Sequence, residues 1–310
     1  MLHINNLTVQ FKGTHQNMMT VLDDFTLHIP QQKSLFLIGE TGSGKSILLL
    51  AILGLLPHSA IVSGEVWCND KNLLTCSEQE RCHIRGKDIS YIPQGSGSAL
   101  NPIMKIGKQV GERLVDQSIC SKSEAMIRTT AQLEKLDFDD GKKWANTYQH
   151  QLSGGMKQRV LIVSGTIVPT KFIVADEPTK GLDGDRVDEV IDIFADMADT
   201  TLICVSHDLH FTRKLADNIV VMYAAQMVEY SEKKLFFNNP LHPYSKLMIS
   251  SLVENGMHYD GGFAPPHTAY DNQGCRFRAR CPHAHEKCVK MPTLIDYDGR
   301  KVRCWLYDKT

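Results

Sequence analysis

A glycine-rich segment near residue 40 carries the residue types that hold phosphate groups. Glycines in the pattern GxxxxGK[ST] let backbone N–H groups converge on phosphate oxygens, and the following helix adds the positive end of its dipole. We expect Lys45 to lie near the β- and γ-phosphates and Ser46 to bind Mg²⁺ through its hydroxyl. An apolar run of strand length, residues 34–38, precedes the segment and favours phosphate binding over a plain glycine turn. The segment reads Gly39, Glu40, Thr41, Gly42, Ser43, Gly44, Lys45 and Ser46.

Two neighbouring carboxylates, Asp176 and Glu177, follow a second apolar run at residues 172–175. Adjacent side chains at a strand end point in opposite directions, so the pair can serve two tasks. We expect Asp176 to hold Mg²⁺ through the ion's hydration shell. We expect Glu177 to face the γ-phosphate and to orient or deprotonate the attacking water. The alternative is an acidic pair that caps the next helix.

His207 and Gln94 follow other apolar runs, at residues 201–205 and 89–92. An imidazole at His207 can contact the γ-phosphate or Glu177, although a single histidine in such a turn is more often structural. Gln94 has no distinctive chemistry by itself.

A second anion cradle lies more than a hundred residues beyond the first, in the segment LSGGMKQR at residues 152–159. Its Ser153, Gly154 and Gly155 stand at the expected N-terminus of a helix, where backbone N–H groups face an anion. One nucleotide rarely needs two cradles from one chain. Two chains that face each other head to tail use both.

Together these segments resemble the ATP-binding subunits of ABC transporters, over about residues 1 to 250. The glycine-rich segment is similar to the family's Walker A motif, Gln94 to its Q-loop and LSGGMKQR to its signature. The remaining matches are Walker B at residues 172–177, the D-loop at Gly181, Leu182 and Asp183, the switch histidine His207, and Phe11 at the place of the aromatic that stacks on adenine.

The resemblance implies an α/β fold of the ABC-type P-loop NTPase class. Such a fold has a RecA-like parallel core, an N-terminal antiparallel β subdomain and a helical subdomain, here expected at about residues 95–160 of a domain spanning 1–255. It also implies ATP hydrolysis with Mg²⁺ in a head-to-tail dimer. Lys45, Gln94, Glu177 and His207 would then be catalytic, while Ser153, Gly154, Gly155 and Asp183 would contact the ATP of the opposite subunit.

The residue pattern predicts several elements independently of the resemblance. Runs at residues 2–11 and 21–29 are β-prone, and the buried strands alternate with helix-length segments, which favours a largely parallel sheet. Residues 101–151 lack a strong strand pattern and predict a helical insertion. Residues 219–224 and 227–230 predict a hairpin that turns at Ala225 and Gln226. Some positions depart from the family pattern: Lys180-Gly181 before the D-loop Leu-Asp, Gln149 before the signature, the hairpin turn without glycine, and Tyr230.

The last part of the chain, residues 256–310, has a composition of its own. Four of the nine cysteines lie there: Cys275, Cys281, Cys288 and Cys304. Together with the PLHPYS segment at residues 240–245, their spacing resembles the C-terminal region of dipeptide, oligopeptide and nickel importer ATPases. The resemblance favours a [4Fe–4S] cluster on these thiols, which the basic residues around them would stabilise. A zinc site, to which His283 and His285 could add ligands, and ordinary buried thiols are the alternatives.

Charge and hydropathy exclude several functional classes. Lys and Arg number 34 against 35 Asp and Glu, so no overall charge favours binding to nucleic acid. No apolar run approaches the roughly 20 residues of a membrane-spanning helix, and no secretion signal is recognisable.

The resemblance implies a peripheral protein on the cytoplasmic side of the cell membrane that energises import of peptides, nickel or metal chelates. Its expected partners are a second ATPase subunit, in a heterodimer, two membrane permeases and an extracytoplasmic substrate-binding protein. A non-transport or regulatory ABC ATPase, associated with nucleic acid or ribosomes, is the alternative.

Overall fold

The computed structural model describes residues 1–13, 18–95, 99–197, 199–252 and 262–308. The chain forms two compact units. Unit 1 comprises Met1–Pro30, Leu35–Cys76 and Ala216–Thr310, and unit 2 comprises Gln31–Ser34 and Ser77–Leu215. The expected boundary at residue 256 lies outside the described residues, and the chain after it belongs to unit 1.

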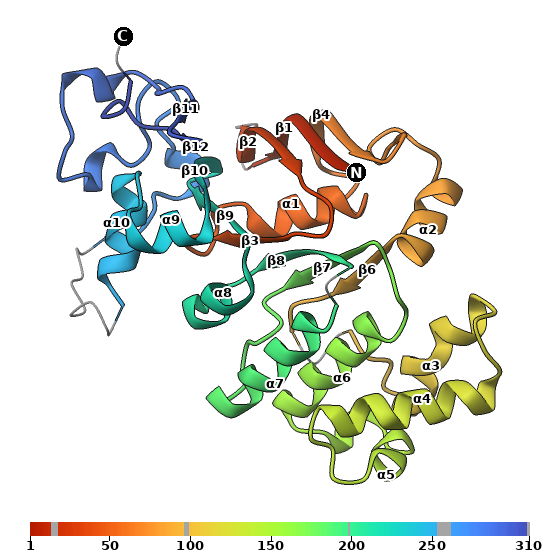
Figure 1. Ribbon diagram of the computed structural model, residues 1–310. Helices are drawn as coiled ribbons and strands as arrows, with labels where there is room; N and C mark the ends of the chain where they lie inside the picture. The colour runs from red at the N-terminus through yellow and green to blue at the C-terminus, as the bar shows by residue number, and fades with distance from the viewer. Residues whose placement is uncertain (14–17, 96–98, 198, 253–261, 309–310) are drawn as a thin grey trace. The chain divides into compact units, whose positions relative to one another are not determined.

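Unit 1 begins with an antiparallel sheet of four strands in the order β2-β1-β4-β5 (Figure 1). Every second side chain of β1 is buried until Asn6, whose φ of 46° interrupts the alternation. Beyond this irregularity Leu7 and Val9 return to the core, as the predicted half-buried strand requires. The bounds are β1 Leu2–Lys12, β2 Met18–Ile29, β4 Ile61–Cys68 and β5 Lys71–Asn72.

The other strands of unit 1 form a sheet in the order β11-β12-β10-β9-β3, and the apolar run of β3 is buried along nearly its full length. β3 pairs in parallel with β9, which forms an antiparallel hairpin with β10, and β10 pairs with the short strand β12 of the C-terminal extension. The phosphate loop connects β3 to α1. The bounds are β3 Ser34–Ile38, β9 Asn218–Tyr223, β10 Gln226–Glu232, β11 Ile295–Tyr297, β12 Arg300–Val302, α1 Lys45–Ile52, α9 Lys233–Asn238 and α10 Pro243–Ser250.

The hairpin between β9 and β10 turns at Ala224 and Ala225, one residue earlier than predicted. Both alanines have positive φ, 47° and 69°, a conformation that usually requires glycine or asparagine. Hydrogen bonds hold the turn. The backbone N–H of Asp23 donates to the Ala225 carbonyl at 2.9 Å, and Arg276 donates to the Ala224 carbonyl at 2.6 Å.

Unit 2 contains the parallel strands β6, β7 and β8, paired in that order, with helices before and after them in the chain. The predicted helical insertion is confirmed, because α3, α4 and α5 pack on one another and α3 and α4 also contact α6 (Figure 1). The bounds are β6 Ile89–Ile92, β7 Phe172–Asp176, β8 Thr201–Val205, α2 Glu78–Lys87, α3 Ile106–Asp116, α4 Lys122–Lys135, α5 Gly141–Ala145, α6 Gly154–Thr166, α7 Gly184–Ala195 and α8 Leu209–Leu215.

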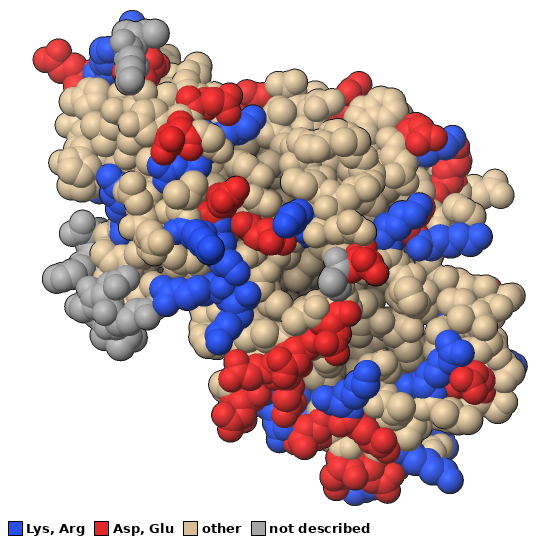
Figure 2. All heavy atoms as spheres, viewed as in Figure 1, with Lys and Arg blue, Asp and Glu red and all other residues tan. Residues whose placement is uncertain are grey.

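The surface carries charges of both signs. Figure 2 shows basic and acidic side chains interspersed on the face that it draws, with acidic ones gathered over α7, whose sequence includes Asp185, Asp188, Glu189 and Asp192. Within the described ranges no helix combines the length and apolar character needed to cross a bilayer.

Candidate nucleotide-binding site

The phosphate loop of unit 1 has a backbone that only glycine accommodates at two points. Gly39 has a φ of 146°, and a Cβ there would lie 2.1 Å from the Met222 carbonyl oxygen. Gly44 has a φ of 99°, and a Cβ there would lie 2.4 Å from the Val21 carbonyl oxygen. The loop therefore nests against β9 and β2, and a side chain at either glycine would displace it.

Lys45, the first residue of α1, is buried and turns back onto the loop. Its Nζ donates to the carbonyl oxygens of Gly39 at 2.7 Å and Glu40 at 2.8 Å, and lies 3.3 Å from Ser43 Oγ. The ammonium group is thus held inside the loop. Thr41, Gly42 and Ser46 are exposed, and Phe11 is half-buried in β1 of the same unit.

The C-terminal part of the chain contacts the phosphate loop, which sequence reasoning missed. The Glu40 carboxylate pairs with Arg280 at 2.8 Å, and the Glu40 N–H donates to the Tyr244 hydroxyl at 2.9 Å. Burial raises the pKa of Tyr244, so its hydroxyl stays protonated near neutral pH. The PLHPYS segment, which includes Tyr244, was the sequence signal for this contact, although the spacing did not indicate its target.

The residues predicted to act on the γ-phosphate lie in unit 2. Asp176 is the buried last residue of β7, and Glu177 follows with a φ of 49°. The Glu177 N–H donates to the Val205 carbonyl at 2.9 Å, and His207 Nε2 lies 2.8 Å from Glu177 Oε1. The ends of β7 and β8 therefore bring Glu177 and His207 together, as expected for the contact between these two side chains.

Lys180 adds a cation to this group. Its Nζ lies 3.8 Å from Glu177 Oε2, and its side chain is 61% exposed. The sequence indicated Lys180 only as a departure from the family pattern before the D-loop. Its position beside the carboxylate follows from the turn after β7.

The signature and the D-loop lie against each other in unit 2. Ser153 caps α6 by accepting the Met156 N–H, and Asp183 caps α7 by accepting the Arg186 N–H. A Cβ at Gly155 would lie 3.5 Å from the Gly181 carbonyl oxygen. Ser153, Gly154 and Asp183 are exposed at the N-termini of these two helices. Gln94 is exposed after β6.

The four C-terminal cysteines influence one another electrostatically. The pKa of Cys304 is raised to about 11, mainly by burial and further by negative charge on Cys275, Cys281 and Cys288. The Cys275 N–H donates to the Cys288 carbonyl at 3.0 Å. Among the described residues, however, no three His, Cys, Asp or Glu side chains converge as ligands of one metal ion. The structure therefore supports neither the [4Fe–4S] cluster expected on these four cysteines nor the alternative zinc site. His283 and His285 are exposed.

Comparisons with known proteins identify the family. The sequence matches the profile of the ABC transporter family over residues 22–180 and that of the oligopeptide/dipeptide transporter C-terminal region over residues 228–288. The chain is 35% identical to the oligopeptide transport ATP-binding protein AppD of Bacillus subtilis, covering 100% of this chain and 97% of AppD. It is 33% identical to DppD, the dipeptide transport ATP-binding protein of the same organism, over 99% of this chain and 95% of DppD.

A third relative is the oligopeptide transport ATP-binding protein OppD of Escherichia coli, 31% identical over 98% of this chain and 92% of OppD. The fold is similar to that of the ATP-binding cassette MJ0796, solved as a dimer with ADP and Pi, with a TM-score of 0.69, 24% identity and coverage of 75% of this chain and 99% of that one. The α/β fold predicted for an ABC-type ATPase is confirmed, and the chain belongs to the ABC transporter family, among the ATP-binding proteins with the oligopeptide/dipeptide C-terminal region.

Proposed function

We propose that this chain is the ATP-hydrolysing subunit of an ABC importer for di- or oligopeptides. The observation that carries the proposal is the similarity, over nearly the whole chain, to ATP-binding proteins of oligopeptide and dipeptide transport. The match includes the C-terminal region as well as the ATPase domain. It favours transport over a regulatory or nucleic-acid-associated ATPase.

In the proposed mechanism, the phosphate loop holds the ATP phosphates while Lys45 exchanges its loop carbonyls for phosphate oxygens. Ser46, through its hydroxyl, and Asp176, through the ion's hydration shell, would hold Mg²⁺, and Glu177 would orient or deprotonate the attacking water. His207, 2.8 Å from Glu177, fixes the carboxylate or contacts the γ-phosphate. Gln94 would contact the ATP and its Mg²⁺, and Phe11 would stack on adenine.

The exposed signature and D-loop support the proposed head-to-tail dimer. Ser153, Gly154, Gly155 and Asp183 would contact the ATP bound by the opposite subunit, because the N-terminus of α6 carries the positive end of the helix dipole and its Ser153 and Gly154 are exposed. The proposed partners are a second ATPase subunit that differs from this chain, two permeases and an extracytoplasmic binding protein. The chain would bind peripherally to the permeases at the cytoplasmic side of the membrane. The proposed domains are residues 1–255, with the helical subdomain at about 95–160, and the extension at 256–310.

Replacing Glu177 by glutamine tests the catalytic assignment. The variant should still bind ATP but lose its turnover by about 100-fold or more, because general base catalysis contributes roughly that much. Phosphate release by the assembled complex measures turnover, and equilibrium dialysis measures binding. Asp188→Asn, an exposed carboxylate on α7, is the matched control. Undiminished turnover in Glu177→Gln would exclude the role given to Glu177.

Uptake by cells that lack this chain tests the proposed substrate. Such cells should lose uptake of a radiolabelled tripeptide and regain it when the wild-type chain, but not Glu177→Gln, is restored. Loss of labelled nickel uptake with unchanged tripeptide uptake would contradict peptide import and favour a metal importer.

We further propose a [4Fe–4S] cluster on Cys275, Cys281, Cys288 and Cys304. The support for this proposal comes from the sequence, namely the resemblance of the cysteine spacing to that of importer ATPases and the basic residues around the thiols, which would stabilise the negative charge of the cluster. Bound to thiolates, such a cluster supplies a cross-link within the extension. Protein purified without oxygen should contain about four irons per chain and absorb visible light. Stoichiometric zinc, or no metal, would contradict the cluster.

A further inference from the structure

Glu40, the second residue of the phosphate loop, is held from three directions by later parts of unit 1. Its Oε1 accepts from Arg280 at 2.8 Å and its Oε2 accepts from the Ala264 N–H at 2.8 Å. Its own N–H donates to the Tyr244 hydroxyl at 2.9 Å. The side chain and the backbone of one loop residue are therefore both tied to segments more than 200 positions away in the sequence.

Two aromatic side chains position the Arg280 guanidinium beside Glu40. Arg280 ends the short 3-10 helix Arg278–Arg280, and its side chain is only 12% exposed. The guanidinium carbon lies 5.5 Å from the centre of the Phe277 ring and 5.7 Å from that of Tyr223. Two aromatic rings thus confine the cation, so little side-chain freedom is lost when it pairs with the carboxylate.

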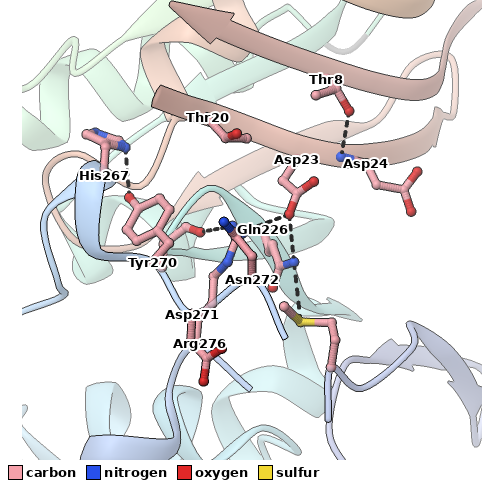
Figure 3. A network of polar contacts seen from close by, with 12 residues as sticks. Thr8, Thr20, Asp23, Asp24, Gln226, His267, Tyr270, Asp271, Asn272 and Arg276 are labelled. Atoms are coloured by element: carbon pink, nitrogen blue, oxygen red, sulfur yellow. Dashed lines mark hydrogen bonds and ion pairs between the residues drawn. The ribbon is translucent and has the colours of Figure 1, made fainter. Parts of the chain in front are cut away.

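The extension also contacts the phosphate loop at a second residue, Gly42. The Tyr270 hydroxyl lies 3.4 Å from the Gly42 carbonyl oxygen and 2.9 Å from His267 Nδ1. Figure 3 shows Tyr270 beside Arg276, which pairs with Asp23 of β2 at 2.6 Å. Arg276 therefore anchors this segment to β2, and the extension borders the loop from Glu40 to Gly42.

The negative charge of Glu40 affects how well the phosphate loop binds a nucleotide. A carboxylate within a loop that receives a polyphosphate repels the incoming anion, and in a partly buried place this repulsion is weakly screened. Arg280 supplies the compensating positive charge. It also holds Glu40, whose carbonyl accepts from Lys45 at 2.8 Å in the same loop.

We propose that Arg280 is a positioning residue for ATP: it neutralises Glu40 and fixes the phosphate loop in the conformation that receives the phosphates. The inference rests on the proposed nucleotide site and deepens it. It assigns the C-terminal extension a part in ATP affinity, separate from any group held by the cysteines.

The test is ATP affinity of the purified full-length chain, measured with Mg²⁺ by equilibrium dialysis. Arg280→Gln leaves Glu40 uncompensated and should weaken ATP binding about 5- to 10-fold at low ionic strength. Arg280→Lys keeps the charge but loses the planar group that packs between the two rings, so its affinity should lie between those of Arg280→Gln and wild type. The double variant Glu40→Gln with Arg280→Gln removes both charges and should recover most of the lost affinity. Arg278→Gln, in the same 3-10 helix but paired with Asp271, is the matched control and should bind like wild type.

Salt dependence separates the charge effect from a merely structural one. The ratio of the Arg280→Gln and wild-type dissociation constants should shrink as ionic strength rises from about 0.01 to about 1 M, where the Debye length falls from about 30 to about 3 Å. Trp305 donates to the Lys290 carbonyl inside the extension. In chains whose other two tryptophans, Trp67 and Trp144, are replaced by phenylalanine, its fluorescence reports whether the extension stays folded.

Three results would overturn the inference. These are wild-type affinity in Arg280→Gln, a loss equal at all ionic strengths, and a loss not recovered in the double variant. If the wild-type chain itself bound no ATP, the proposed nucleotide site would be wrong and this inference with it. Wild-type binding with equal affinities in Arg280→Gln and Arg278→Gln would refute the inference alone.

Discussion

Replacing Lys45 by methionine removes the charge of the phosphate loop while keeping much of the volume of the side chain. A unit charge pair about 4 Å apart contributes about 4 kcal/mol at an effective dielectric constant near 20, which alone corresponds to a roughly 1000-fold change in affinity. In the ATP-free chain, however, the Lys45 Nζ already donates to the carbonyls of Gly39 and Glu40. Giving up these two charge-assisted hydrogen bonds at about 1.5 kcal/mol each, the lower end for such bonds, offsets about 3 kcal/mol. The net loss in Lys45→Met should therefore be about 1 kcal/mol, or about 5-fold in the dissociation constant.

Equilibrium dialysis of labelled ATP in the presence of Mg²⁺ measures this loss. Lys135→Met, at the exposed end of α4, is the control and should leave the dissociation constant unchanged. A loss near 1000-fold would show that the bonds within the loop do not compete with the nucleotide. A loss below about 2-fold would show that Lys45 does not reach the phosphates, and either result refutes the reasoning.

Three further predictions concern stability, measured as the free energy of unfolding in urea. Ala225→Gly should stabilise the chain by about 0.5 to 1 kcal/mol because φ is 69° there, and destabilisation would contradict the turn geometry. Arg276→Met should destabilise the chain by about 2 to 4 kcal/mol, since the Arg276 side chain is 3% exposed and binds Asp23 and the Ala224 carbonyl. When Arg276→Met is combined with Asp23→Asn, the loss of stability should be less than the sum of the two single losses, and full additivity would contradict an ion pair between Arg276 and Asp23. Burial lowers the pKa of His242 to about 3, so the unfolded chain binds this proton below about pH 6.5 and the folded chain does not. The free energy of unfolding should therefore fall from pH 6.5 toward pH 3 by up to about 1.4 kcal/mol per pH unit. His242→Asn keeps an acceptor at the N-cap of α10 and should flatten this slope, and an unchanged slope would refute the role given to His242.

Most of the ATPase fold could be predicted because its signals are local. The apolar runs at residues 34–38, 172–175 and 201–205 are strands, and each is followed by the expected polar group. The hairpin was predicted one residue too late because two alanines occupy its left-handed positions, where sequence rules expect glycine or asparagine. Arg276 and Asp23, far away in the sequence, hold that turn, so no local pattern could reveal it.

The candidate site divides in the same way. Within unit 2, the contact between Glu177 and His207 was predictable, since the parallel strands β7 and β8 end at the same edge of their sheet. The contact of Lys180 with Glu177 was not, because an exposed lysine in a turn has no preferred partner until the turn is built.

By itself, the sequence determined where phosphate, magnesium and water chemistry can occur, because those residue types act through fixed spacing within one loop or strand end. Only the tertiary structure decided that Arg280 meets Glu40 across 240 positions and that Tyr244 supports the same loop residue. Such contacts depend on how β10, α10 and the extension fold back onto β3, and every arginine in the extension has the same local chemistry until that folding selects one of them.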